Sequence, residues 1–251
     1  MKICYLSSEC VPFIKTGGLA DVSGSLPAEI QKHRNEMKVF LPLYDLIDYE
    51  KNNLEEIPEY AGSSVFIGGK EFFYSLHYAE REGVSHFFIA NNGFFNRKSV
   101  YTNAPDEDMR FIFFQYAVLN VIQRMQWAPD VIHCHDWQSA LIPELLKTSF
   151  SWDKLFSNTK TLLTIHNLAY QGIFGTISVR DAGLPENKIL PGGLYEHNGL
   201  FNFMKTGILT ADYISTVSQS YAEEIKTPEY GEGLQSYIQL RSERVSGILN
   251  G

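Results

Sequence analysis

Short apolar runs of strand length recur along the chain, separated by segments with helical spacing. The pattern predicts strands at Lys2–Ser7, Met37–Leu41, Ser63–Ile67, Glu71–Tyr78, Val84–Ala90, Val131–His133, Thr161–Ile165, Tyr213–Val217 and Val245–Leu249. Two of them, Ser63–Ile67 and Glu71–Tyr78, alternate about Gly68-Gly69, which predicts a hairpin. Strands that alternate with helices predict an α/β fold, with a Rossmann-like, mostly parallel sheet and helices on both faces.

The helical segments each place apolar residues on one face. Predicted helices are Gly18–His33, Asp106–Gln126, Phe201–Leu209 and Gln219–Lys226, with a further helix after the His-Cys-His-Asp-Trp run. Pro27 lies inside the first and should kink or split it. Ser218 is a good N-cap for the last.

Composition narrows the possible partners. The 251 residues suffice for one large α/β domain or two small ones, and 44% hydrophobic with 20% charged residues is ordinary for a globular protein. The net charge of −8 does not favour nucleic acid or an anionic membrane. Any anionic ligand must therefore be held by local groups.

The N-terminus and the cysteines indicate the cellular compartment of the protein. The opening MKICYLSSE lacks the apolar core and cleavage site of a signal peptide. No apolar stretch approaches the roughly 18 residues that span a bilayer. The cysteines Cys4, Cys10 and Cys134 are odd in number and have no CxxC spacing. We expect buried, reduced thiols in a cytoplasmic protein.

The first chemical motif is Lys15–Val22 (KTGGLADV), between the first strand and the first helix. Gly17 and Gly18 let backbone N–H groups approach a ligand, and a helix N-terminus adds orphan donors and partial positive charge. With Lys15 close by, the motif predicts a phosphate site. The alternative is a surface lysine beside an ordinary glycine turn. The pattern is neither GxGxxG nor a P-loop.

The second motif, His133–Trp137 (HCHDW), follows an apolar strand. His133 and His135 share a strand face and could bind one metal, but no third ligand has suitable spacing, so no metal is expected. Asp136 suits sugar recognition, because a carboxylate accepts hydrogen bonds from two hydroxyls. The alternative for Asp136 is a helix N-cap.

The third motif is His166–Gly172 (HNLAYQG), which places His166 and Asn167 at the mouth of another strand. Ligands bind outside the carboxyl ends of strands in such sheets. The alternative for His166 is a core histidine bonded to backbone. The aromatic segment from Ile89 to Tyr101 could bind sugar rings, but ordinary packing is the favoured interpretation.

Taken in order, these motifs resemble the bacterial-type glycogen/starch synthases over essentially the whole chain. The matching segments are Lys15–Val22, His135–Trp137, His166–Gly172, Ala211–Ser218 and Ser246–Gly251. The resemblance implies the N-terminal half of a GT-B glycosyltransferase, with residues 1–251 forming an acceptor-side Rossmann-like catalytic domain. It implies a retaining hexosyltransferase that moves glucose from ADP-glucose to the non-reducing end of an α-1,4-glucan, without cofactor or metal.

The resemblance also implies roles for individual residues. Lys15, Gly17 and Gly18 would contact the donor phosphates, with Asp21 in the same motif. The groups around the transferred glucose and the acceptor would be Asp136, His166 and Asn167.

Two departures from the family pattern matter. Around Phe95-Asn96-Arg97 the family often has a tyrosine-type aromatic and an acid, which weakens a sugar contact there. The family's nucleotide pocket and essential glutamate belong to a C-terminal domain that is absent from this sequence. The isolated chain is therefore expected to fold but to be inactive, and the donor base, ADP or UDP, is not decided.

Two other functions are compatible with the sequence. It could be a glucan-binding or regulatory module of the same fold without activity. It could be a transferase of the same architecture with another donor or acceptor. A nicotinamide oxidoreductase is disfavoured by the lack of GxGxxG.

Overall fold

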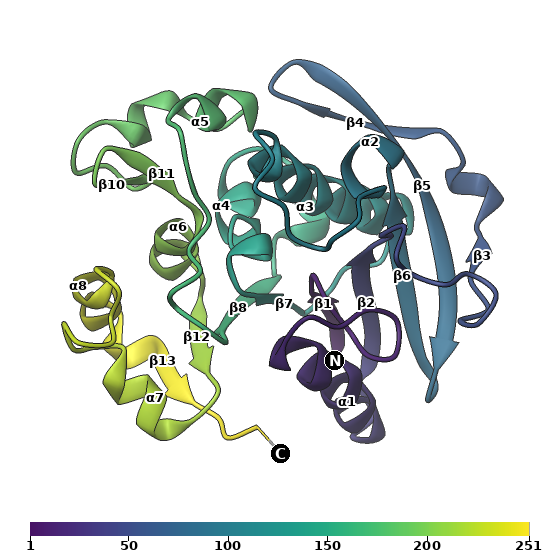
Figure 1. The fold of residues 1–251 in the computed structure, drawn as a ribbon, viewed down its shortest axis with the longest axis horizontal. Helices are drawn as coiled ribbons and strands as arrows, with labels where there is room; N and C mark the ends of the chain where they lie inside the picture. The colour runs from purple at the N-terminus through teal and green to yellow at the C-terminus, as the bar shows by residue number, and fades with distance from the viewer. Residues whose placement is uncertain (251) are drawn as a thin grey trace. The chain divides into compact units, whose positions relative to one another are not determined.

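A computed structural model describes residues 1–250 of the chain. The chain divides into two compact units, Met1–Val131 and Ile132–Gly251. Figure 1 shows the elements of both.

The first unit is built on a mixed sheet with the strand order β1-β2-β6-β5-β3, and β4 pairs with β5. Its elements are β1 (Lys2–Leu6), α1 (Gly18–Lys32), β2 (Glu36–Pro42), β3 (Glu55–Glu56), β4 (Ser63–Ile67), β5 (Lys70–Arg81), β6 (Val84–Ala90), α2 (Asn92–Phe95) and α3 (Glu107–Arg124), with a 3-10 turn at Pro58–Tyr60. The pairs β1–β2 and β2–β6 are parallel, whereas β5 runs antiparallel to β6, β4 and β3. The predicted α/β class is confirmed, with parallel pairing in the β1-β2-β6 part of this sheet and antiparallel pairing where β5 joins it.

The predicted hairpin is confirmed. β4 and β5 pair antiparallel from Ser63↔Tyr74 to Ile67↔Lys70. The two turn residues, Gly68 and Gly69, have φ values of +55° and +80°, which glycine adopts without strain.

Pro27 was expected to kink or split helix α1, and the split is wrong, because α1 continues through Pro27. A proline inside a helix has no N–H for the carbonyl four residues earlier, here that of Ser23. The thiol of Cys10 donates to the Ser23 carbonyl oxygen at 3.2 Å. That substitute bond satisfies the acceptor, and Pro27 itself is buried on the inner side of the helix.

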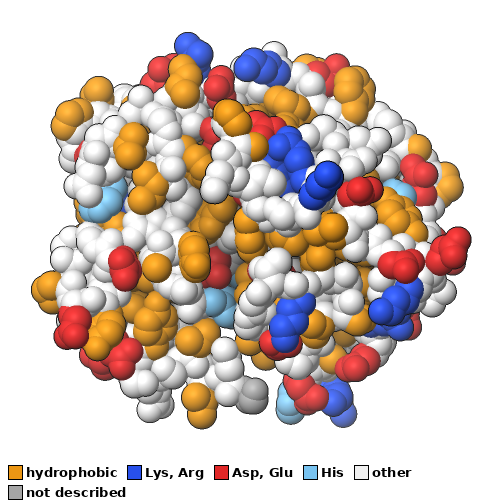
Figure 2. Space-filling model, in the orientation of Figure 1, with side chains coloured by type: hydrophobic (Ala, Val, Ile, Leu, Met, Phe, Trp, Pro, Cys, Tyr) orange, Lys and Arg blue, Asp and Glu red, His pale blue; other side chains and the backbone are white. Residues whose placement is uncertain are grey.

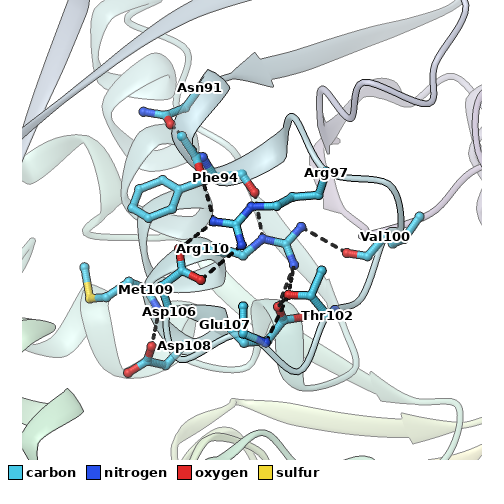
Figure 3. Close-up of polar contacts among 12 residues, drawn as sticks. Asn91, Phe94, Arg97, Val100, Thr102, Asp106, Glu107, Asp108, Met109 and Arg110 are labelled. Atoms are coloured by element: carbon cyan, nitrogen blue, oxygen red, sulfur yellow. Dashed lines mark hydrogen bonds and ion pairs between the residues drawn. The ribbon is translucent and has the colours of Figure 1, made fainter.

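Helix α3 is almost wholly buried and holds a buried ion pair. Arg110 is fully buried, and its guanidinium lies 2.6 Å from the Glu107 carboxylate one turn earlier. Arg110 also donates to the carbonyl oxygens of Phe94 (2.7 Å) and Val100 (3.0 Å). Figure 3 shows these bonds converging on one guanidinium from the segment before α3. The loop that leads into α3 is thereby fixed to the helix.

The second unit has the strand order β13-β12-β8-β7. Its elements are β7 (Val131–His135, from Ile132 on), α4 (Ile142–Lys147), β8 (Lys160–Ile165), β9 (Ile173–Phe174), α5 (Ile177–Asp181), β10 (Glu196–His197), β11 (Leu200–Asn202), α6 (Phe203–Thr210), β12 (Tyr213–Thr216), α7 (Gln219–Glu224), α8 (Gln235–Leu240) and β13 (Val245–Gly247), with 3-10 turns at Trp137–Ser139, Lys154–Phe156, Glu186–Ile189 and Ser242–Arg244. The pairs β8–β12 and β12–β13 are parallel. A small antiparallel sheet has the order β10-β11-β9.

Of two predictions in this unit, the cap at Ser218 is confirmed and the start of the helix at Phe201 is wrong. Ser218 caps α7 as expected, with its side chain accepting the Tyr221 N–H at 3.0 Å. The predicted helix Phe201–Leu209 begins later, because Phe201 and Asn202 pair with β9 as a strand. Asn202 then caps α6 by accepting the Lys205 N–H at 2.8 Å.

The cysteines match the expectation of buried thiols. Cys4, Cys10 and Cys134 are all buried and free of disulfides. Burial raises the pKa of Cys10 to about 12, which keeps its thiol protonated. Within residues 1–250, every helix is too short or too polar to cross a bilayer.

Candidate functional site

In the first unit, the candidate site is the loop that joins β1 to α1. It carries Lys15, Thr16 and Gly17 to the N-terminus of the helix, where Gly17 is the N-cap and Gly18 the first helical residue. All four are exposed. The helix therefore presents its N-terminal partial positive charge at an accessible loop, as the sequence predicts.

A buried carboxylate that the sequence did not single out organises this loop. Glu9 is 3% exposed, and it accepts hydrogen bonds from the backbone N–H groups of Thr16 and of Gly17, the latter at 3.0 Å. Its other oxygen accepts from the Thr16 hydroxyl at 2.7 Å and from the Tyr101 hydroxyl at 2.5 Å. The Gly17 N–H is thus committed to Glu9. In the sequence, Glu9 is marked only by its place six residues before the KTGG run.

Lys15 and Asp21 face each other across the first turn of α1. The Lys15 ammonium lies 2.7 Å from both carboxylate oxygens of Asp21. The two side chains are 52% and 56% exposed, so the pair contributes at most about 1 kcal/mol. An anionic ligand that reached Lys15 would therefore compete with a weak, solvated partner.

Gly17 and Gly18 have open space around them, whereas Gly24, the next glycine of α1, is closely packed. A Cβ placed on Gly17 or Gly18 would meet no atom within 4 Å, and neither residue has a positive φ. A Cβ on Gly24 would lie 2.2 Å from Cγ2 of Val11. Packing therefore explains Gly24, whereas Gly17 and Gly18 leave open space beside the helix N-terminus.

In the second unit, the candidate residues follow β7 and β8. Asp136 has φ +52° and ψ −169°, a strained conformation for a residue with a side chain, at roughly 1–3 kcal/mol. Its N–H donates to the Thr164 carbonyl oxygen at 3.0 Å, and its carboxylate accepts the His166 N–H at 2.8 Å. The Asp136 side chain does not cap the following 3-10 turn. It connects the ends of two strands, and so brings Asp136 and His166 together.

Three histidines lie in a row at this edge. Nδ1 of His135 is 2.9 Å from Nε2 of His166, so one of these nitrogens donates to the other. The rings of His133 and His135 have centroids 4.1 Å apart, and Nε2 of His133 lies 2.6 Å from the Thr164 hydroxyl. His166 is half-buried, whereas His133 and His135 are buried. The buried pair therefore orients the accessible ring.

The buried histidines stay neutral at physiological pH. Desolvation, followed by the neighbouring His166, lowers the pKa of His133 to about 3. Burial, followed by the neighbouring His133 and His166, lowers the pKa of His135 well below its ordinary value. Nδ1 of a neutral His135 can accept a hydrogen bond from the N–H of His166, which fits an orienting role.

Asn167 is exposed and forms a local turn. Its side-chain oxygen accepts the Ala169 N–H at 3.0 Å. The next residue, Leu168, donates its N–H to the Tyr221 hydroxyl of α7 at 2.9 Å. The amide nitrogen of the Asn167 side chain consequently points away from the turn's own hydrogen bond.

The remaining features have simpler explanations. Across residues 1–250, no cluster of three or more His, Cys, Asp or Glu side chains has metal-holding geometry. The packing interpretation of the aromatic segment is confirmed, because the rings of Phe94 and Phe95 pack at a tilt against Phe113 of α3, with centroids 5.1 and 6.0 Å away. On the face drawn in Figure 2, Lys and Arg side chains are scattered among Asp and Glu rather than gathered into one basic field.

The fold and these two clusters define an α/β protein with polar groups at the carboxyl ends of parallel strands. The family model described as "Starch synthase catalytic domain" matches residues 2–240, so the chain belongs to this family.

Named relatives agree with this assignment. The chain is 40% identical to a glycogen synthase of Lactococcus lactis over 100% of this chain and 52% of that protein. It is 42% identical to one of Clostridioides difficile over the same shares, and 39% identical to one of Bacillus subtilis over 100% of this chain and 51% of the relative. The chain spans about half the length of these relatives.

A solved structure shares the fold. The catalytic domain of starch synthase IV from Arabidopsis thaliana, bound to ADP and acarbose, matches with a TM-score of 0.90 and 29% identity. The match covers 99% of this chain and 51% of that one. The agreement extends over both units of the chain.

Proposed function

We propose that the chain is the acceptor-side part of a retaining glucosyltransferase, which moves glucose from ADP-glucose to the non-reducing end of an α-1,4-glucan. The family membership, the glycogen synthases among its relatives and the similarity to a starch synthase structure bound to ADP and acarbose support this proposal. No cofactor or metal is required in it.

The observation that carries the proposal is the open loop at the N-terminus of α1. Lys15 supplies a full positive charge, and the N–H of Gly18 lies where the helix offers no acceptor of its own. The space beside Gly17 and Gly18 admits a ligand. Because Glu9 takes the Gly17 N–H, we assign Gly17 the role of leaving room and Gly18 that of donor to the diphosphate.

In the second unit, Asp136, His166 and Asn167 are assigned to the transferred glucose and the acceptor end. Asp136 sets the position of His166 through the backbone bond between them. His135 holds the His166 ring. The Asn167 side chain offers amide N–H groups to sugar hydroxyls.

The chemistry asks for two kinds of stabilisation. Breaking the bond between glucose and phosphate builds positive charge on the sugar and negative charge on the departing diphosphate. Lys15 and the N-terminus of α1 stabilise the diphosphate, at a site arranged before the reaction. Asp136 and His166 orient and stabilise the sugar. Exclusion of water then favours transfer over hydrolysis.

We further propose that the isolated chain transfers no glucose. Its relatives are about twice as long, and the donor's base and the remaining phosphate contacts are assigned to a second, C-terminal domain. Incubation of the chain with labelled ADP-glucose and glycogen checks this, and incorporation clearly above a no-enzyme blank would contradict it.

The donor loop is tested in the full-length parent with Lys15→Gln, Lys15→Arg and Gly18→Ala. Lys15→Gln should raise the KM for ADP-glucose and weaken inhibition by ADP, while the KM for glucan stays nearly constant. Lys15→Arg should retain more function, although a planar guanidinium replaces a compact ammonium. Gly18→Ala should raise the donor KM without loss of stability, because its Cβ meets no protein atom.

Gly24→Ala is the matched control for Gly18→Ala on the same helix. It should lower stability through the Val11 contact. If Lys15→Gln changed only the glucan KM, the loop would belong to the acceptor and the assignment of the donor phosphates would be wrong.

A further inference from the structure

Glu9 is buried beside the donor loop, yet its carboxylate touches four donors. One oxygen accepts the backbone N–H groups of Thr16 and Gly17, and the other accepts the hydroxyls of Thr16 and Tyr101. A carboxylate is stable out of water only when such donors surround it. Each part of the loop between β1 and α1 that Glu9 contacts is therefore held in one arrangement.

Tyr101 is itself held on both sides by the buried ion pair of α3. Arg110 donates to the carbonyl oxygen of Val100 at 3.0 Å. The N–H of Thr102 donates to the Glu107 carboxylate at 3.1 Å. Figure 3 shows Val100 and Thr102 both turned towards Arg110 and Glu107. The position of Tyr101, which lies between these two residues, is therefore fixed.

The Tyr101 hydroxyl donates a hydrogen bond to Glu9 in this arrangement. Burial, followed by the charges of neighbouring groups, raises the pKa of Tyr101 well above its ordinary value. The phenol keeps its proton, and lies 2.5 Å from Glu9 and 2.8 Å from the Ser8 hydroxyl.

We propose that Glu9 is a positioning residue for the Lys15–Gly18 loop, and that the Arg110–Glu107 pair acts on this loop through Tyr101. The contacts run from the ion pair to Tyr101, then to Glu9, and then to the backbone of Thr16 and Gly17. Glu9 touches no substrate in this arrangement, and acts by presenting Lys15 and Gly18 to the donor diphosphate. Its importance for the reaction rests on the proposed function of that loop.

The geometry predicts different effects on the loop for two substitutions, Glu9→Gln and Glu9→Ala. A glutamine retains one acceptor oxygen, which can face the two backbone N–H groups. Its amide N–H groups can then donate to the hydroxyls of Thr16 and Tyr101, which turn to accept. Glu9→Gln should therefore keep the loop. Glu9→Ala leaves both backbone N–H groups without this acceptor and should release it.

The direct test is hydrogen exchange of the Thr16 and Gly17 amides in the 251-residue chain, followed by NMR. We expect Glu9→Ala to accelerate exchange at these two amides at least tenfold, and Glu9→Gln to stay within about threefold of the native rate, since tenfold corresponds to about 1.4 kcal/mol. Tyr101→Phe, which removes a single donor, should have an intermediate effect and serves if Glu9→Ala does not fold.

The matched control is Glu196→Ala in the second unit. Glu196 also accepts two backbone N–H groups, those of Gly192 and Gly199. Its substitution should accelerate exchange at those two amides and leave Thr16 and Gly17 unchanged.

In the full-length parent, Glu9→Ala should raise the donor KM and leave the glucan KM nearly unchanged. Glu9→Gln should have a donor KM close to that of the native enzyme. Unchanged protection of Thr16 and Gly17 in a folded Glu9→Ala chain would overturn the positioning role. Lost protection with an unchanged donor KM would overturn the importance of Glu9 for donor binding. If Lys15→Gln then also left the donor KM unchanged, the failure would lie with the proposed function of the loop.

Discussion

The buried ion pair of α3 allows a quantitative prediction for Arg110→Met. Methionine fills a similar volume but has no donor, so the substitution isolates the polar contacts. The Glu107 carboxylate loses its charged partner, and the carbonyl oxygens of Phe94 and Val100 lose their donor. Breaking a buried pair on one side typically costs about 3–5 kcal/mol, because a charge remains buried without compensation.

The measurement is the free energy of unfolding from urea titration of the chain. Arg110→Met should lower it by about 3–5 kcal/mol, and the double variant Arg110→Met/Glu107→Gln should recover part of the loss, because it removes the uncompensated charge. Lys32→Met is the control. Lys32 pairs with Glu29 on the surface of α1, and both side chains are more than 60% exposed. Its loss should be much smaller than that of Arg110→Met, because solvent screens an exposed pair.

Two results would refute this reasoning. One is a loss for Arg110→Met no larger than that for Lys32→Met, which would mean that solvent already compensates Glu107. The other is strict additivity in the double variant, which would show that Arg110 and Glu107 do not act as a pair.

Three further predictions concern catalysis, pH and metals. In the full-length parent, His166→Ala should lower kcat much more than it raises the donor KM, at about tenfold in kcat per 1.4 kcal/mol; His197→Ala is the control in the same unit, and an unchanged kcat with a raised KM would make His166 a ground-state contact. Burial lowers the pKa of His86 from 6.5 to about 4, so the unfolded chain takes up a proton first and stability present above pH 6.5 is lost as the pH falls towards 4. At pH 5 the loss from His86 should be about 2 kcal/mol, and His86→Gln should flatten this slope in urea titrations between pH 7 and 5. Chelator should leave the activity of the parent unchanged, and recovery by one specific metal would show a metal requirement.

Local patterns predicted the parts of the fold that depend on neighbours in sequence. The bounds of Ser63–Ile67 and Val84–Ala90 agree with the structure, because alternation and flanking glycines act within a few residues. The cap at Ser218 is equally local. Pro27 is different, since the thiol that satisfies the helix lies on another segment. Propensity alone could not anticipate that compensation.

The candidate sites divide in the same way. The sequence singled out Lys15, Asp136 and His166 from motifs, and the structure shows that Asp136 and His166 are in contact. It did not single out Glu9, whose contact with Tyr101 spans 92 residues. The bond between His135 and His166 spans 31 residues. Contacts of this kind follow from the order of strands in the sheet, which the motifs do not encode one by one.

Glu9 and Asp136 have a physical feature in common that affects how their variants should be interpreted. Each stands after a strand and uses its carboxylate to accept a backbone N–H of a neighbouring loop, Glu9 from Gly17 and Asp136 from His166. An alanine at either position removes this support as well as any direct contact with substrate. Asparagine at position 136 retains an acceptor for the His166 N–H while removing the charge. Loss of activity in Asp136→Asn would therefore report on the charge, whereas loss in Asp136→Ala alone would report on the position of His166.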